Sequence, residues 1–197
     1  MLNKIKDIIT NSILTKQHIL ADEQLLSVIE QIVAICIKAL KADNKIFFCG
    51  NGGSAADAQH LAAEFTGRFY LDRDPLYAEA LHVNSSYLTS VANDYSFEEV
   101  YARLVKAKMR RGDILFGIST SGNSMNIIKA MSQAKMQDGV TIAMTGSSGG
   151  KLASNADLLL RMPSSDTPRI QEAHIMVGHI ICELVERGIF DNSTPSK

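Results

Sequence analysis

The sequence predicts an α/β fold in which a parallel sheet lies between two layers of helices. Short apolar stretches alternate along the chain with segments whose apolar residues recur at helical spacing. The expected strands are apolar almost throughout, which is typical of parallel strands buried on both faces. Loops rich in glycine and serine directly follow two of these strands. Ligands bind at this edge of an open parallel sheet.

Residues 1–42 predict two amphipathic helices, at 2–20 and 21–40. The second helix is apolar around so much of its circumference that it needs cover on more than one side. We therefore expect these helices to pack against a partner subunit and to serve oligomerisation. The alternative is that both wrap around their own domain.

Residues 45–190 predict the α/β core. Strands are expected at 45–49, 77–82, 113–118, 140–145 and 157–162. Helices are expected from the loop at 51–54 to about residue 65, and at 85–92, 97–107, 126–136 and 170–187. No internal repeat or low-complexity linker divides the chain, so its 197 residues predict a single domain, with disorder expected only at 192–197.

Charge and composition exclude several classes of protein. The formal net charge is −1 and no long basic run occurs, so we expect no nucleic-acid partner. No uncharged stretch of about 18 apolar residues is present, so no membrane span is expected. Lys4, Lys6 and Asp7 interrupt the N-terminus, which does not resemble a signal peptide. The three cysteines fit neither a disulfide framework nor a zinc ribbon, and we expect a cytoplasmic protein with reduced, buried thiols.

The first loop, residues 51–54, joins a strand to an alanine-rich helix. Its sequence, NGGS, makes a turn whose backbone N–H groups can face an anion. On the helix that follows, His60 and Glu64 are four residues apart and share a face. Such a pair is often a simple surface interaction. Because it follows an anion-binding loop, it also suits proton transfer or metal binding.

The second loop, residues 119–124, reads STSGNS and lies between a strand and a helix. Its hydroxyls and the free N–H groups of a helix N-terminus favour a phosphate. The lysine of the nucleoside-triphosphate loop is missing, and so is the dinucleotide fingerprint, which argues against both nucleotide classes. The alternative is an ordinary turn with a serine cap. Two such loops after two parallel strands would flank one crevice.

The closing helix and a short polar pair supply further candidates. Gln171 and His179 are about 80° apart around an ideal helix and so line one edge of it. Like His60, His179 could share a cleft with Glu64. The Asn93–Asp94 pair lies between two expected helices, where it would either cap a helix or contact a substrate.

Five segments of the chain resemble the sedoheptulose-7-phosphate isomerases, or phosphoheptose isomerases, of the sugar-isomerase (SIS) domain family. They are residues 49–68, 88–91, 92–94, 117–124 and 169–174. The likeness extends from the N-terminal helices to about residue 187. It implies a single SIS domain, a flavodoxin-like three-layer αβα sandwich with a five-stranded parallel sheet. It also implies a homotetramer with active sites at the subunit interfaces.

The resemblance also implies a reaction and residues for it. The reaction interconverts sedoheptulose 7-phosphate and D-glycero-D-manno-heptose 7-phosphate through an enediol, as the first step towards the ADP- or GDP-heptose of lipopolysaccharide or capsule. The implied catalytic pair is Glu64 and His179. The implied substrate-binding residues are Asn51, Gly52, Gly53, Ser54, Glu64, Asn93, Asp94, Ser119, Thr120, Ser121, Ser124 and Gln171. One zinc ion per subunit would be bound by His60, Glu64, Gln171 and His179.

A second hypothesis comes from a different functional class. One branch of the family consists of tetrameric scaffolds that bind the bacterial replication initiator protein, and there the positions matching Glu64 and His179 are not the acid and base. Both residues are present here, which favours the enzyme. A sugar-phosphate-sensing regulator is not expected, because the sequence shows no DNA-binding segment.

Overall fold

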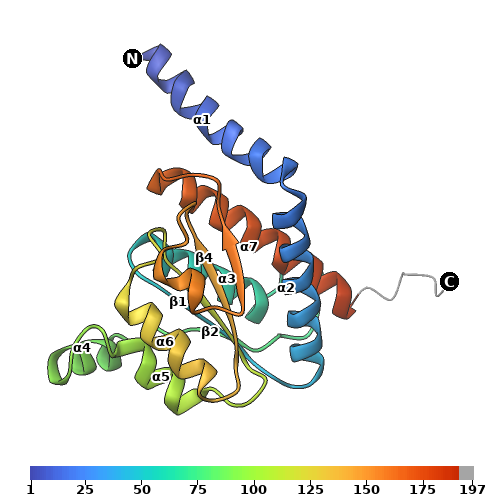
Figure 1. The fold of residues 1–197 in the computed structure, drawn as a ribbon. Coiled ribbons are helices and arrows are strands. Elements are labelled where there is room, and N and C mark those ends of the chain that lie inside the picture. The colour runs from blue at the N-terminus through green and yellow to red at the C-terminus, as the bar shows by residue number, and fades with distance from the viewer. Residues whose placement is uncertain (191–197) are drawn as a thin grey trace.

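The computed structural model describes residues 1–190 as one α/β unit (Figure 1); the disorder expected at 192–197 lies outside the described residues. The strands are β1 (Ile46–Gly50), β2 (Ala78–Ala80), β3 (Ile114–Ile118), β4 (Val140–Thr145) and β5 (Leu158–Arg161). All pair in parallel, in the order β2-β1-β3-β4-β5. The predicted fold class is therefore confirmed, flavodoxin-like strand order included.

Helices cover both faces of this sheet. They are α1 (Leu2–Ala21), α2 (Glu23–Lys41), α3 (Gly53–Thr66), α4 (Ser85–Asp94), α5 (Val100–Lys108), α6 (Met125–Lys135) and α7 (Thr167–Phe190). Successive strand residues point to opposite faces, so Phe48 of β1 joins a core with α2, α3 and α7. Its neighbour Phe47 joins a second core with α5 and α6. Two cores on one buried sheet make the three-layer sandwich.

Most element boundaries lie within three residues of those expected, and the differences have local causes. β2 is about half its expected length because it is an edge strand and the chain turns away at Leu81. α7 begins at Thr167 rather than Ile170, because Pro168 suits the first turn of a helix. A short 3₁₀ helix, η1 (Gly150–Ser154), follows β4 and was not expected.

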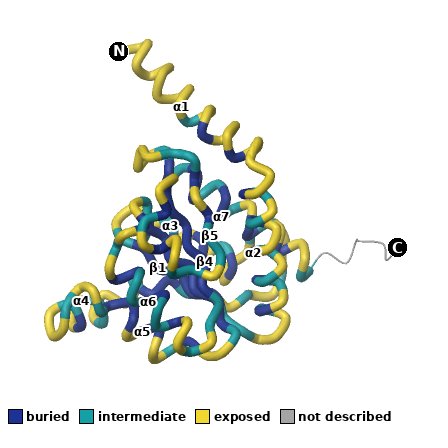
Figure 2. Tube along the Cα trace, viewed as in Figure 1, coloured by how far each residue is buried: buried dark blue, intermediate teal, exposed yellow. Residues whose placement is uncertain are grey.

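The two N-terminal helices differ in how they pack. α2 buries Leu25, Ile29 and Ile32 on its own domain and contacts α7. α1 projects from the body, and most of its residues are exposed (Figure 2). Within one chain, α2 is covered by its own domain, whereas α1 leaves an apolar surface open. No helix among residues 1–190 is long and apolar enough to cross a membrane.

Candidate functional site

The strand order places the two loops that are expected to bind an anion side by side. β1 and β3 are neighbours, and their carboxyl ends lead into α3 and α6, which cover opposite faces of the sheet. This is the switch point at which open α/β sheets bind ligands. Asn51, after β1, and Asn126, on α6, exchange two amide hydrogen bonds of 2.9 Å each. The pair fixes the two loops relative to each other.

The second loop is tightly folded. The hydroxyls of Ser119 and Ser124 are hydrogen-bonded at 3.0 Å. Gly122 has a φ of +66°, and a Cβ there would collide with the carbonyl of Gly149. Beside the loop lies a pocket of about 270 Å³ to which Thr120 and Ser121 contribute. Hydroxyls therefore line this edge of the sheet, as the sequence predicts.

Gln171 joins the closing helix to the first loop. Its side-chain amide lies so close to Gly53 that a Cβ at position 53 would collide with it. A larger residue at position 53 would therefore displace the Gln171 amide from the start of α3. Gln171 is about 12 Å along the helix axis from His179. The structure thus places Gln171 at the loops, and its part in a metal site stays a prediction.

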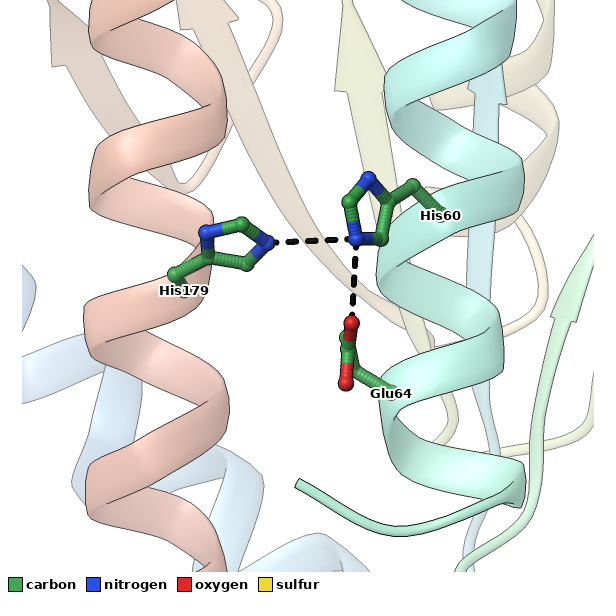
Figure 3. Close-up of side chains that lie close together, drawn as sticks. All are labelled: His60, Glu64 and His179. Carbon is green, nitrogen blue, oxygen red and sulfur yellow. Dashed lines mark hydrogen bonds and ion pairs between the residues drawn. The ribbon is translucent and has the colours of Figure 1, made fainter. Parts of the chain in front are cut away.

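His60, Glu64 and His179 converge in one cluster (Figure 3). The first two come from successive turns of α3, and the third comes from α7, which packs beside it. Nε2 of His60 is 3.0 Å from Oε1 of Glu64 and 3.3 Å from Nε2 of His179. Close helix packing makes this possible, because a Cβ at Gly178 would collide with Leu61. The three residues that the sequence analysis expects to share a cleft lie close together, and their roles stay predictions.

Hydrogen bonds alone cannot satisfy both contacts of His60 in this cluster. In a neutral imidazole, a ring nitrogen carries either one N–H or one lone pair. At most one of the two contacts at Nε2 of His60 is therefore a good hydrogen bond. A cation at the centre would satisfy all three side chains at once.

The cluster also has the composition and spacing of a metal site. Its three ligand atoms all lie within 4.8 Å of one another. Ligands of a tetrahedral zinc ion lie roughly 3.3 Å apart when their bonds are about 2.0–2.2 Å long. Two imidazoles and one carboxylate, with a fourth position left for water or substrate, are a donor set found in catalytic zinc sites. The residues therefore fit zinc.

The Asn93–Asp94 pair is placed differently from the expectation. The two residues do not lie between helices but form the last turn of α4, which extends to Asp94 instead of residue 92. The helix continues because the N–H of Tyr95 still finds the carbonyl of Val91. Both side chains are exposed, and Asn93 donates a hydrogen bond to Asp94. In this chain α4 lies at the outer edge of the sandwich (Figure 1), and Asp94 is not part of the cluster of His60, Glu64 and His179.

Three residues near the site were not found from the sequence. Asn126 pairs with Asn51 as described above. The buried hydroxyl of Tyr101 donates to the carbonyl of Gly50, the last residue of β1. Asp57 lies one turn before His60, a spacing that would have pointed to it, and has a buried oxygen without a partner among residues 1–190. Burial raises the pKa of Asp57 to about 6, although the nearby His60 acts to lower it.

Comparison with known proteins gives consistent results. Residues 10–146 match the family model of the SIS domain. The phosphoheptose isomerase of Aneurinibacillus thermoaerophilus is 50% identical over 192 residues, which cover 98% of this chain and 97% of that protein. The phosphoheptose isomerase of Clostridium acetobutylicum is 51% identical, covering 96% and 97%. The solved structure of phosphoheptose isomerase GmhA from Neisseria gonorrhoeae superimposes with a TM-score of 0.88 at 42% identity, covering 94% of this chain and 98% of that one.

Proposed function

The chain belongs to the SIS-domain family and is a sugar-phosphate isomerase, and we propose that its reaction is the interconversion of sedoheptulose 7-phosphate and D-glycero-D-manno-heptose 7-phosphate. The observation that carries this proposal is the convergence of His60, Glu64 and His179 on α3 and α7, two helices whose first turns lie at the loops after β1 and β3. Relatives of about 50% identity named phosphoheptose isomerase support the choice of substrate. The product would enter heptose synthesis for lipopolysaccharide or capsule.

In this proposal, the loops hold the end of the substrate that does not react. The hydroxyls of Ser119, Ser121 and Ser124 and the first N–H groups of α6 would bind the phosphate. Asn51 and Gly53 would bind the sugar chain, with Gln171 packed behind them. Binding energy gained at the phosphate orients the distant reacting carbons. Contacts of Asn93 and Asp94 with substrate would come from α4 in another arrangement or from α4 of another subunit.

Glu64 and His179 would carry out the proton transfers. The ketose loses a proton from C1 to a base, which leaves an enediol, and a proton returned to C2 completes the aldose. A carboxylate and an imidazole at one cluster can take and give these protons and move the hydroxyl proton between O1 and O2. Each such group typically contributes about 10²–10⁴-fold to the rate.

A zinc ion bound by His60, Glu64 and His179 would supply Lewis-acid polarisation of the substrate oxygens. The three side chains would still have different roles. His60 has no proton-transfer role in this scheme and orients the other two. A carboxylate bound to a metal is a weaker base than a free one, so Glu64 serves best as the base when it is released from the metal.

We also propose that the protein is a homotetramer with its active sites at subunit interfaces. The support is α1, whose apolar side chains are largely exposed along the helix, among them Ile5, Ile9 and Ile13. Such a patch usually marks an interaction surface. The double substitution Ile9→Ser and Ile13→Ser should lower the mass measured by light scattering, whereas Lys6→Gln on the same helix should not. A monomeric wild type would contradict the proposal.

The isomerase proposal is tested with sedoheptulose 7-phosphate and purified protein. Formation of the aldose is followed by NMR in the presence of Zn²⁺ and after treatment with a chelator. We expect turnover with metal and a lower rate without it. Absence of turnover under every metal condition would overturn the proposal and would favour the scaffold alternative.

A further inference from the structure

A buried ion pair joins α7 to the loop that follows α3. The carboxylate of Glu186 lies 2.9 Å from Nε of Arg73, and each side chain is only 2% exposed. Glu186 follows His179 by seven residues on α7, which is nearly two full turns, so the two residues share a face of the helix. The ion pair therefore lies directly along α7 from the proposed active site.

Glu186 fixes the backbone of the loop between α3 and β2. Its two oxygens accept the N–H groups of Phe69, Tyr70 and Leu71 at 2.9, 2.7 and 3.0 Å. With the bond from Arg73, the carboxylate has four donors. Such charge-assisted bonds are about twice as strong as neutral ones. The loop is consequently held against α7 at three successive residues.

Arg73 holds the last turn of α3 through its fork of N–H groups. Nη2 donates to the carbonyl of Glu64 at 3.0 Å, and Nη1 donates to that of Phe65 at 2.8 Å. Final carbonyls of a helix lack partners within the helix. The guanidinium supplies those partners and, in doing so, binds the backbone of Glu64 itself.

The same network reaches His179 through Phe69. The Phe69 ring lies against the imidazole of His179, with 5.7 Å between ring centroids and 51° between planes. Glu186 holds the backbone of Phe69, and this keeps the ring within reach of His179. The network thus ends on both members of the proposed catalytic pair, Glu64 on one side and His179 on the other.

We infer that Arg73 and Glu186 are positioning residues that hold Glu64 and His179 at the separation needed for proton transfer. The inference rests on the proposed function for its kinetic consequence. Its structural part concerns the geometry of the His60, Glu64 and His179 cluster. That part does not depend on which substrate the protein takes. Replacing outer groups that orient metal ligands typically costs 10–100-fold in metal affinity or activity.

The test compares Glu186→Gln with a control variant, Glu99→Gln. The control makes the same substitution in the ion pair between Glu99 and Lys129, which is distant in sequence from Glu186. We expect Glu186→Gln to lower kcat at least tenfold with KM for sedoheptulose 7-phosphate within about threefold, because the phosphate loops are untouched. Its affinity for Zn²⁺, measured by competition with a chromophoric chelator, should also fall at least tenfold. Glu99→Gln should match the wild type in all three quantities.

A second variant guards against a simple folding defect. Arg73→Lys keeps a cation beside Glu186 but lacks the planar fork that reaches two carbonyls. It should fold and show the same loss of kcat and Zn²⁺ affinity. A folded Glu186→Gln or Arg73→Lys protein with both quantities within twofold of the wild type would overturn the inference. Failure of both variants to fold would also overturn it, since the network would then serve stability alone.

Failure of the isomerase proposal can be told apart from failure of this inference. If the wild type does not turn over sedoheptulose 7-phosphate, the proposed function fails while the Zn²⁺ affinities still test the positioning role. The nuclear Overhauser contact between the Phe69 and His179 rings needs neither substrate nor metal. It should be present in the wild type and Glu99→Gln and lost in Glu186→Gln; its persistence there would overturn the inference.

Discussion

Glu64 and His179 come from different helices, yet both approach a single atom, Nε2 of His60. The proposed function gives these two side chains separable roles. Glu64→Gln keeps the size of the side chain but removes the proposed base, and His179→Ala removes the imidazole. We expect each variant to stay folded with wild-type mass and to lose at least about 10²-fold in kcat. Near-normal rates in both, measured by the NMR assay, would show that the assignment of the catalytic pair is wrong.

His174 is a second residue whose chemistry can be tested, this time through stability. It is fully buried on α7, and its Nε2 lies 3.1 Å from the carbonyl of Thr145. Burial lowers the pKa of His174 to about 4, against the opposing effect of that hydrogen bond. As the pH falls, this histidine is therefore protonated in the unfolded chain at a higher pH than in the folded chain. The stability that neutral His174 contributes is complete above about pH 6.5 and is lost as the pH falls towards 4.

We expect His174→Gln to reduce the pH dependence of the free energy of unfolding. The glutamine amide can still donate to Thr145 but takes up no proton. The loss of stability between pH 7 and pH 4 should shrink by up to about 3 kcal/mol. Urea denaturation of metal-free protein measures this, with the exposed His18→Gln as the control. An unchanged pH dependence in His174→Gln would contradict the prediction.

Local spacing decides which of these residues the sequence can predict. His60 and Glu64 are four apart on one helix, so a shared face follows from helix geometry alone. His179 is also found because few histidines compete for the role. Asn126 and Glu186 are not found, because their partners are 75 and 113–117 residues away and no periodicity links them. Their roles depend on packing between elements that only the folded chain defines.

At the level of elements, the Asn51–Asn126 pair links the β1 loop to α6. Asn126 is buried, and its oxygen also accepts the N–H of Ile127. Asn126→Leu keeps the approximate shape but leaves the Asn51 amide without its partner. We expect the KM for sedoheptulose 7-phosphate to rise about tenfold, with a smaller effect on kcat, and stability to fall by about 1–3 kcal/mol.

The matched control for that variant is Asn155→Leu. Asn155 also bonds to α6, through Ile128 and Ser132, but does not touch the β1 loop. It should lose stability without a change in KM. If Asn126→Leu binds substrate as tightly as the wild type, the pair does not position the loop.

Element types follow from the sequence more readily than element ends. Apolar runs and helical periodicity predict, in order, the five strands and seven α-helices of residues 1–190. The start of α7 and the end of α4 differ because hydrogen bonds at helix ends depend on a few local groups. α4 matters most, since its two extra residues, Asn93 and Asp94, lie on an exposed helix end instead of in a turn.

For the whole molecule, strand order is the property that creates the site. Alternation of strands and helices predicts a parallel sheet, but the pattern alone does not state which strands are neighbours. The order β2-β1-β3-β4-β5 puts the β1 and β3 loops together and sends α3 and α7 along the same face. The exposed apolar residues of α1 also matter at this scale, because only another subunit of the proposed tetramer would cover them. The order is implied by family resemblance rather than by residue pattern.

We propose that the cluster of Glu64 and His179 isomerises sedoheptulose 7-phosphate through an enediol. The most direct measurement is the reaction run in D₂O with Zn²⁺ and followed by NMR. We predict aldose 7-phosphate carrying deuterium at C2, formed by the wild type and at least about 10²-fold more slowly by Glu64→Gln. Absence of the aldose, or its formation at the same rate by Glu64→Gln, would contradict the claim.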